Sequence, residues 1–246
     1  MSDRVAYLGH ATALIEIDGR RILTDPVLRP RILHLRRYAK MPREDDHQRI
    51  DAVLISHGHP DHLDPPSLRR VGRERPLIVP RGLGRLLRRR RFRQIIELSA
   101  GERTQVAGLT IRATPAVHDG RRAPVGRAVP ALGYVVEGGS SVYFAGDTDL
   151  FDGMGEIAIG LDLALLPIAG WGPRVQRGHL DPVRAAIAAA MLRPRIAIPI
   201  HWGTLRAVHF RRTDPRAPAL EFERLVHERA PGVEPRVLDP GDFTRY

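Results

Sequence analysis

Cysteine is absent from this sequence of 246 residues. That absence excludes disulfide bonds, iron–sulfur clusters, thiolate zinc sites and cysteine nucleophiles. Long apolar runs are missing as well, because the most apolar window, residues 157–171, is interrupted by Asp162 and Pro167 and is too short to cross a bilayer as a helix. The first residues carry no basic stretch followed by an apolar one, as a leader peptide would. We therefore expect a cytoplasmic protein without stable membrane insertion.

Lysine is almost absent, since Lys40 is the only lysine among 39 basic residues. The net charge is nevertheless +11. So lopsided an arginine excess is typical of a coding bias, which raises the charge without any special partner. The alternative is an anionic partner, either a small anionic substrate or nucleic acid. The arginine-rich run 85–93 has leucines at helical spacing, and we expect its one aromatic residue, Phe92, to point inward with them, so nucleic acid is the less favoured partner.

Apolar residues make up 43% and charged residues 27% of the chain, which is enough apolar material for a sizeable core. Short apolar runs alternate with turn signals along the sequence. They predict strands over residues 5–8, 13–17, 21–24, 52–56, 77–79, 109–113, 132–136, 142–145, 163–167 and 196–200. This density of strands favours two sheets packed on each other inside a coat of helices.

Two helices are predicted by their start signals. One begins at Asp181 and Pro182, and the other begins near Asp214, which a proline also follows. Residues 27–50 are polar and irregular, so they predict a long loop with one helical turn. The composition does not shift along the chain, and we therefore predict one domain over residues 1–246.

Three histidines and a carboxylate fall within six residues directly after the predicted strand 52–56, namely His57, His59, Asp61 and His62. A helix would place His57 and His59 on nearly opposite faces, whereas a tight loop, which Gly58 and Pro60 favour, lets all four side chains face one point. Imidazole and carboxylate are ligands that suit zinc, iron and manganese. Four crowded ligands exceed the three that one catalytic metal usually takes, and they predict two metal ions sharing the loop.

Further polar side chains stand where other predicted strands end. His118 follows the strand 109–113, Asp147 follows the strand 142–145, and His201 follows the strand 196–200. The ends of strands are a usual place for functional side chains in layered folds. Together with the first motif, these three positions favour metal ligation.

The seven residues, in this order, resemble the metallo-β-lactamase fold superfamily over essentially the whole chain. Smaller matches resemble the branch that contains N-acylphosphatidylethanolamine phospholipase D and the ascorbate-6-phosphate lactonases. They are Gly9-His10-Ala11-Thr12, Thr24-Asp25-Pro26 and the segments 178–182 and 199–204. The resemblance implies an α/β fold of four layers, αββα, in which two mixed sheets pack face to face with helices outside.

The same resemblance implies two divalent metal ions, with zinc expected and manganese or iron as alternatives. His57, His59 and His118 would hold the first ion. Asp61, His62 and His201 would hold the second ion, and Asp147 would bridge the two. A water or hydroxide shared by the two ions is the expected nucleophile, because coordination lowers its pKa.

Three further residues are candidates for roles around the ions. We expect Asp25 to accept a hydrogen bond from a ligand histidine and so to fix its tautomer. We expect His179 to face the substrate, where it binds a phosphate oxygen or protonates the leaving group, and to be catalytic together with Asp61 and Asp147. We expect His10 to line the pocket.

The leading hypothesis is therefore a dinuclear-metal hydrolase that acts on a phosphodiester or a small anionic ester. The second hypothesis is a lactonase, or another hydrolase of carboxylic esters or amides, with the same site. A third hypothesis, of another class, is a basic nucleic-acid-binding or metal-binding protein without turnover. The sequence leaves the substrate, the native metal and the oligomeric state open, a homo-oligomer included.

Overall fold

The computed structural model describes residues 3–120, 128–170, 177–207 and 214–246. Within these ranges the strands form two seven-stranded sheets and a smaller third sheet. The first large sheet contains, in spatial order, β17 (Phe243–Arg245), β1 (Arg4–Gly9), β2 (Thr12–Ile17), β3 (Arg20–Thr24), β6 (Ala52–Leu54), β7 (Leu77–Pro80) and β8 (Ile95–Leu98). Its strands are antiparallel from β17 to β3 and parallel from β3 to β8, so the sheet is mixed.

The second large sheet is mixed as well. It contains, in spatial order, β16 (Glu234–Pro235), β14 (Ile196–Ile200), β13 (Leu163–Pro167), β12 (Ser141–Phe144), β11 (Leu132–Glu137), β10 (Leu109–Pro115) and β9 (Arg103–Val106). The strands from β12 to β16 are parallel, and those from β9 to β12 are antiparallel. Every residue of β13 and β14 is buried, as the continuous apolar runs in these parallel strands require.

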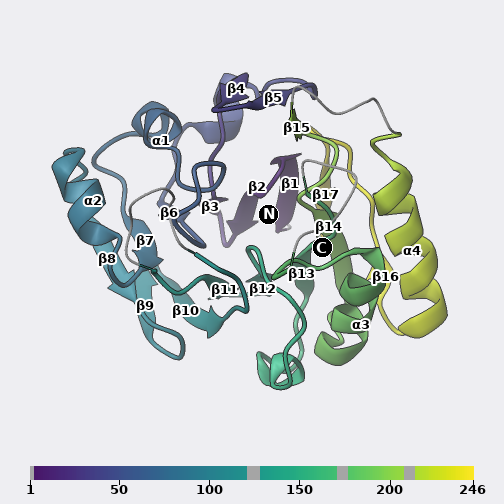
Figure 1. Cartoon of the computed structure of the whole chain (residues 1–246). Coiled ribbons are helices and arrows are strands. Elements are labelled where there is room, and N and C mark those ends of the chain that lie inside the picture. Colours follow the sequence, from purple (N-terminus) through teal and green to yellow (C-terminus); the bar gives the residue numbers. More distant parts are fainter. Residues whose placement is uncertain (1–2, 121–127, 171–176, 208–213) are drawn as a thin grey trace.

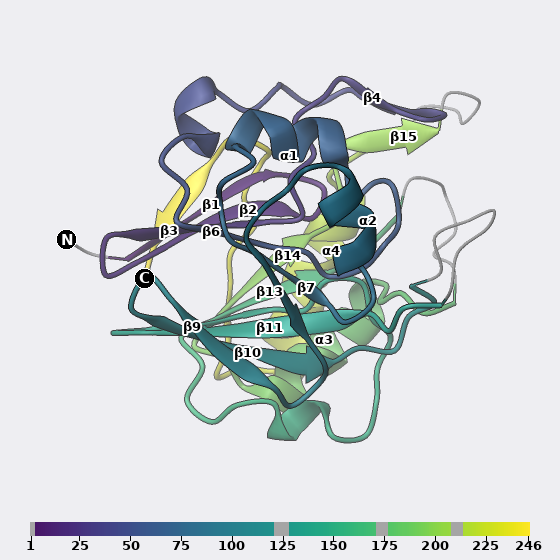
Figure 2. The same ribbon diagram turned by 90° about the vertical axis from the view of Figure 1, so that its left-hand side faces the viewer.

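Alternate residues of the strands in the first sheet belong to two different apolar clusters. Ile15 and Ile22 point into the large cluster between the sheets, whereas their neighbours Leu14 and Leu23 join a second cluster on the outer face. The helices α1 (Pro65–Val71) and α2 (Gly84–Arg89) cover that outer face (Figures 1 and 2). This two-residue alternation is why strands that are apolar throughout still form a layered structure.

The second sheet is covered by α3 (Pro182–Leu192) and α4 (Ala217–Arg229), which lie on the opposite side of the molecule in Figure 1. Helix α3 begins as predicted, because the Asp181 side chain accepts a hydrogen bond from the backbone N–H of Arg184 at 2.8 Å. Phe222 and Val226 of α4 are fully buried in the large cluster. The predicted αββα arrangement of two mixed sheets with helices outside is therefore confirmed.

The prediction of an irregular loop over residues 27–50 is wrong in part. The helical turn is present as η1 (Glu44–His47), but the segment also contains β4 (Arg31–Ile32) and β5 (Leu35–Arg37). These two strands form a three-stranded sheet with β15 (Leu205–Ala207). Their partner strand, β15, lies far away in the sequence, so no local pattern in residues 27–50 predicts the pairing.

The strands that precede the candidate site residues end at one edge of the sandwich. Strands β10, β12 and β14 run in the same direction in the second sheet, so their carboxyl ends share an edge. Strand β6 of the first sheet delivers the His57–His62 loop to that edge. Within the described part of the chain, no helix combines the length and apolar character needed to span a bilayer.

Candidate functional site

The loop after β6 turns tightly enough to gather its histidines. The backbone N–H groups of His62 and Leu63 both donate to the carbonyl of His59, at 3.1 and 2.8 Å. His57 and His62 are fully buried and Asp61 is nearly so, while His59 is half-buried. The chain then enters α1 at Asp64, whose side chain caps the helix. Strand end, turn and helix start therefore fix the loop from both sides.

One group of nitrogen atoms forms around His59. Its Nδ1 lies 2.9 Å from Nε2 of His57 and 3.1 Å from Nε2 of His118. His118 comes from the segment after β10, so the group joins the two large sheets. These three residues could hold a metal ion by the closeness of their ligand atoms.

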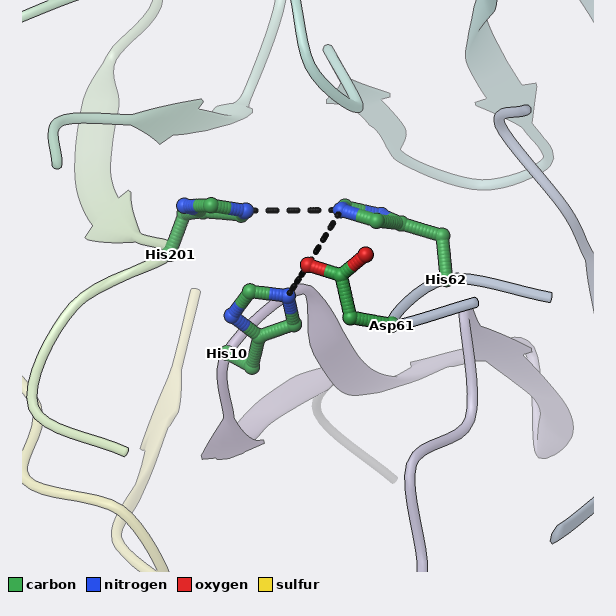
Figure 3. Close-up of side chains that lie close together, drawn as sticks. All are labelled: His10, Asp61, His62 and His201. Atoms are coloured by element: carbon green, nitrogen blue, oxygen red, sulfur yellow. Dashed lines mark hydrogen bonds and ion pairs between the residues drawn. The ribbon is translucent and has the colours of Figure 1, made fainter. Parts of the chain in front are cut away.

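A second group lies deeper in the same site (Figure 3). Nε2 of His62 is 3.3 Å from Nε2 of His201 and 3.8 Å from Oδ2 of Asp61. Nε2 of His10 is 3.0 Å from the same Asp61 oxygen. These four residues form a second set that could hold a metal ion, and all four are buried.

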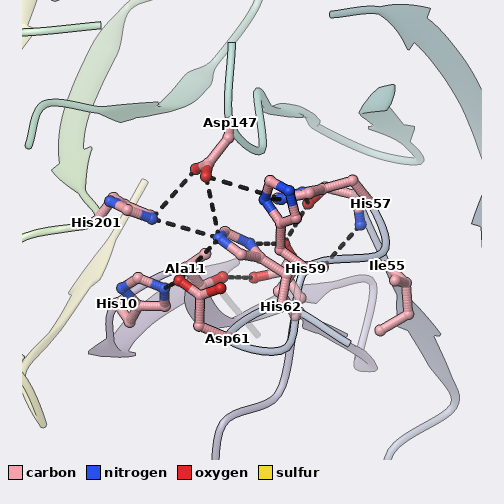
Figure 4. A network of polar contacts seen from close by, with 12 residues as sticks. His10, Ala11, Ile55, His57, His59, Asp61, His62, Asp147 and His201 are labelled. Atoms are coloured by element: carbon pink, nitrogen blue, oxygen red, sulfur yellow. Dashed lines mark hydrogen bonds and ion pairs between the residues drawn. The ribbon is translucent and has the colours of Figure 1, made fainter. Parts of the chain in front are cut away.

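The Asp147 carboxylate lies between the two groups (Figure 4). Its Oδ2 is 3.1 Å from Nε2 of His62 and 3.9 Å from Nε2 of His57, and its Oδ1 is 3.3 Å from Nε2 of His201. Asp147 follows β12, as the sequence predicted. The structure thus brings together all seven predicted ligands, and the Asp147 carboxylate reaches members of both groups.

In three of the rings, the hydrogen bond made by Nδ1 shows that this nitrogen carries a proton. Nδ1 of His118 donates to the Gly178 carbonyl at 2.9 Å, and Nδ1 of His201 donates to the Ala169 carbonyl at 2.7 Å. Carbonyl oxygens only accept, so the Nδ1 atoms carry the protons and a neutral ring presents a lone pair at Nε2. Nδ1 of His62 is turned toward Asp25 at 2.7 Å, but here Asp147 and Asp61 raise the pKa of the ring well above its usual value, against the effect of burial.

Ring nitrogens lie close together across the site. The facing nitrogens of His62 and His201 are 3.3 Å apart, and those of His118 and His59 are 3.1 Å apart. Two nitrogens that each bind zinc at about 2.0–2.1 Å with tetrahedral angles lie about 3.3 Å apart. Ring nitrogens at this spacing, with the carboxylates of Asp61 and Asp147 beside them, fit a metal ion.

A buried carboxylate orients ligands in both groups. Asp25 accepts from His62 Nδ1, and it also accepts from the backbone N–H of Ser56 at 2.7 Å and from the Ser56 hydroxyl. The Ser56 oxygen is then left to accept from Nδ1 of His57, which lies 2.9 Å away. The contact expected of Asp25 is present. Ser56 was not predicted, although its place between a buried strand and His57 could have suggested it.

Burial and charge set the protonation of the site. Burial lowers the pKa of His201 to about 3 and that of His57 well below its usual value, which keeps both rings neutral. Burial opposes ionisation of Asp147, but His201 and His62 hold the pKa of that carboxyl well below its usual range. The pKa of Asp61 is also held well below its usual range, by His62 and His10 against the effect of burial. Neutral imidazoles and ionised carboxylates are the forms that bind metal ions.

His179 lies at the side of the site, in the turn before α3. Its Nε2 is 3.2 Å from Oδ2 of Asp147, and its ring centroid is 4.6 Å from that of His118. Its Nδ1 is buried and has no hydrogen-bond partner among the described residues. His179 therefore lies beside the two ligand sets, with Nε2 turned toward Asp147.

The chain was compared with known families, curated proteins and solved structures. A family described as the beta-lactamase superfamily domain matches residues 20–202. A UPF0173 metal-dependent hydrolase of Methanopyrus kandleri is 36% identical over 255 residues, covering 97% of this chain and 98% of its own length. An N-acyl-phosphatidylethanolamine-hydrolyzing phospholipase D 1 of Caenorhabditis elegans is 31% identical over 224 residues, covering 80% of this chain and 63% of its own length. The solved structure of Igni18, a metallo hydrolase from Ignicoccus hospitalis, has a TM-score of 0.78 and 28% identity, covering 100% of this chain and 99% of its own.

Proposed function

This chain belongs to the metallo-β-lactamase superfamily as a metal-dependent hydrolase, and from this premise we propose that it cleaves phosphodiesters or small anionic esters with two divalent metal ions. The observation that carries the proposal is the convergence of imidazole nitrogens and ionised carboxylates on two neighbouring points. Zinc is the proposed ion, because the donors are mostly imidazole nitrogens.

The residues divide between the two ions as their distances suggest. The first ion would be held by His57, His59 and His118, and the second by Asp61, His62 and His201. Asp147 would bridge them, because its two oxygens reach members of both sets. When bound, such ions supply Lewis acidity and lower the pKa of a water molecule.

His179 is proposed to handle the proton of the leaving group. The hydrogen bond to Asp147 raises the pKa of His179 despite the opposing effect of burial, so the ring holds a proton more readily than a free imidazole. Nε2 faces Asp147 and the two ligand sets, so this nitrogen is the one directed toward the substrate. A protonated ring in this place can bind a phosphate oxygen or protonate the departing oxygen.

An anionic substrate is supported by two observations. The net charge of +11 favours the approach of anions. A curated relative is named as a phospholipase D that hydrolyses N-acyl-phosphatidylethanolamine, which is a phosphodiester. The proposal extends to the class of phosphodiesters and small anionic esters, and not to that lipid itself.

The test is hydrolysis of bis(p-nitrophenyl) phosphate by protein reconstituted with zinc or manganese, against a chelator-stripped sample. We expect a rate that stripping abolishes and added metal restores. Activity of the metal-loaded protein on lactones or carboxylic esters, but not on the phosphodiester, would replace the proposed substrate class. A metal-loaded protein that hydrolyses none of these would be a metal-binding protein without turnover.

Replacing His179 by alanine is expected to lower kcat about 100-fold, as the loss of a general acid does, while metal content stays unchanged. Metal content by atomic emission and steady-state kinetics on the phosphodiester would measure both effects. His227→Ala, on the exposed face of α4, is the matched control and should behave as the wild type. Loss of metal from His179→Ala would show that His179 is a ligand.

A further inference from the structure

His10 stands in the turn between β1 and β2, beside one of the two ligand sets. Its Nε2 lies 3.0 Å from Oδ2 of Asp61, and both side chains are almost fully buried. Its ring centroid lies 4.0 Å from that of His201 and 5.0 Å from that of His62. Among the contacts of the described residues, none joins His10 to the set of His57, His59 and His118. His10 therefore serves one half of the site.

The backbone of His10 is tied to the same half. Its carbonyl accepts from the N–H of His201 at 2.7 Å, and its own N–H donates to Oγ1 of Thr204 at 2.7 Å. His10 has a φ of 58°, in the left-handed region that non-glycine residues rarely adopt. A Cβ on the preceding Gly9 would lie 2.8 Å from the Thr204 side chain, so the turn is pressed against this segment. The ring of His10 thus starts from a fixed position relative to His201.

We propose that His10 is a positioning residue that holds Asp61 in place for the second metal ion only. This inference rests on the proposed two-metal function. As a neutral ring, His10 donates its Nε2–H to Oδ2 of the Asp61 carboxylate. The hydrogen bond restricts rotation of the carboxylate, so that its oxygen is held near His62, 3.8 Å away. The carboxylate of Asp61 therefore already has the orientation needed for coordination when the ion binds.

Two variants separate the reach of the side chain from the strain of the turn. Asparagine tolerates the left-handed backbone, but its amide is too short to reach Asp61, so His10→Asn removes the contact and spares the turn. Glutamine carries an amide N–H at about the distance of Nε2, so His10→Gln restores a donor. His227→Asn, on the exposed face of α4, is the control for the same change of residue type.

The experiment measures zinc stoichiometry and the two zinc dissociation constants by competition with a chromophoric chelator. The absorption spectrum of the cobalt-substituted proteins reports the geometry of each site separately. We expect His10→Asn to bind the second ion about 10–100-fold more weakly and the first ion as the wild type does. We expect His10→Gln to recover most of that affinity, and His227→Asn to match the wild type.

Three results would overturn the proposal. Unchanged affinity for both ions in His10→Asn would show that Asp61 needs no support, while the two-metal function would stand. Equal loss in His10→Asn and His10→Gln would show that the His10 ring is itself a ligand, because its atoms also lie close enough to the other three. A wild type that binds a single ion would overturn the two-metal function, and this inference with it.

Discussion

Asp147→Asn is expected to lower phosphodiesterase activity by about 1,000-fold or more, which corresponds to about 4 kcal/mol of lost transition-state stabilisation. The substitution removes the negative charge that lies between the two ligand sets. It also replaces one carboxylate oxygen by an NH2 group, which is a hydrogen-bond donor and cannot coordinate a metal ion. Both ions would lose a ligand at once, so metal content should fall together with activity.

The fold should survive this substitution. Asparagine has nearly the same shape as aspartate, and β12, which places residue 147, is held by β11 and β13 on either side. Metal content, circular dichroism and the rate on bis(p-nitrophenyl) phosphate would be measured on one preparation. Asp152→Asn, at an exposed position, is the matched control and should keep full activity. Two bound ions and an undiminished rate in Asp147→Asn would show that Asp147 does not bridge.

Asp25→Ala is expected to weaken both metal sites about 10–100-fold each and to destabilise the metal-free protein. Asp25 holds His62 directly and His57 through Ser56, so one carboxylate supports a ligand of each ion. Its removal leaves Nδ1 of His62 and the N–H of Ser56 buried without an acceptor, at a cost of about 1–3 kcal/mol each.

Urea unfolding of the metal-free protein and zinc competition would measure the two effects of Asp25→Ala. Ser56→Ala is the matched comparison, because it breaks only the connection to His57. It should weaken the ion of His57 and leave the ion of His62 nearly unchanged. If Asp25→Ala keeps both affinities, the contacts of Asp25 serve the fold and not the metal site.

The sequence indicated the place of the site because its signals are local. His57, His59, Asp61 and His62 stand on a short loop whose glycine and proline are visible in the sequence, and the other three predicted ligands each follow an apolar run. The strands that precede these ligands end at the same edge of the sandwich, and this alone brings the ligands together. The layered arrangement of the sheets could be predicted for the same reason, since it follows from short apolar runs and turn signals.

The parts that could not be predicted depend on contacts between distant positions. The hydrogen bond from His10 to Asp61 spans 51 positions, and the contact from His201 to His62 spans 139. The pairing of β5 with β15 rests on a few buried side chains, among them Leu35 and Leu205, and has no turn to announce it. Which ring nitrogen faces inward depends on carbonyls such as those of Gly178 and Ala169, whose positions are set only in the folded chain.

The two ligand sets also differ in when they can exist during synthesis. The residues His57, His59 and His118 have all been synthesised once the ribosome has passed residue 118, whereas the other set waits for His201. A nascent chain therefore contains one set of ring nitrogens before the other. His201 is the last of the ligands to be synthesised. Its backbone N–H donates to the carbonyl of His10, in the turn between β1 and β2 that was made first.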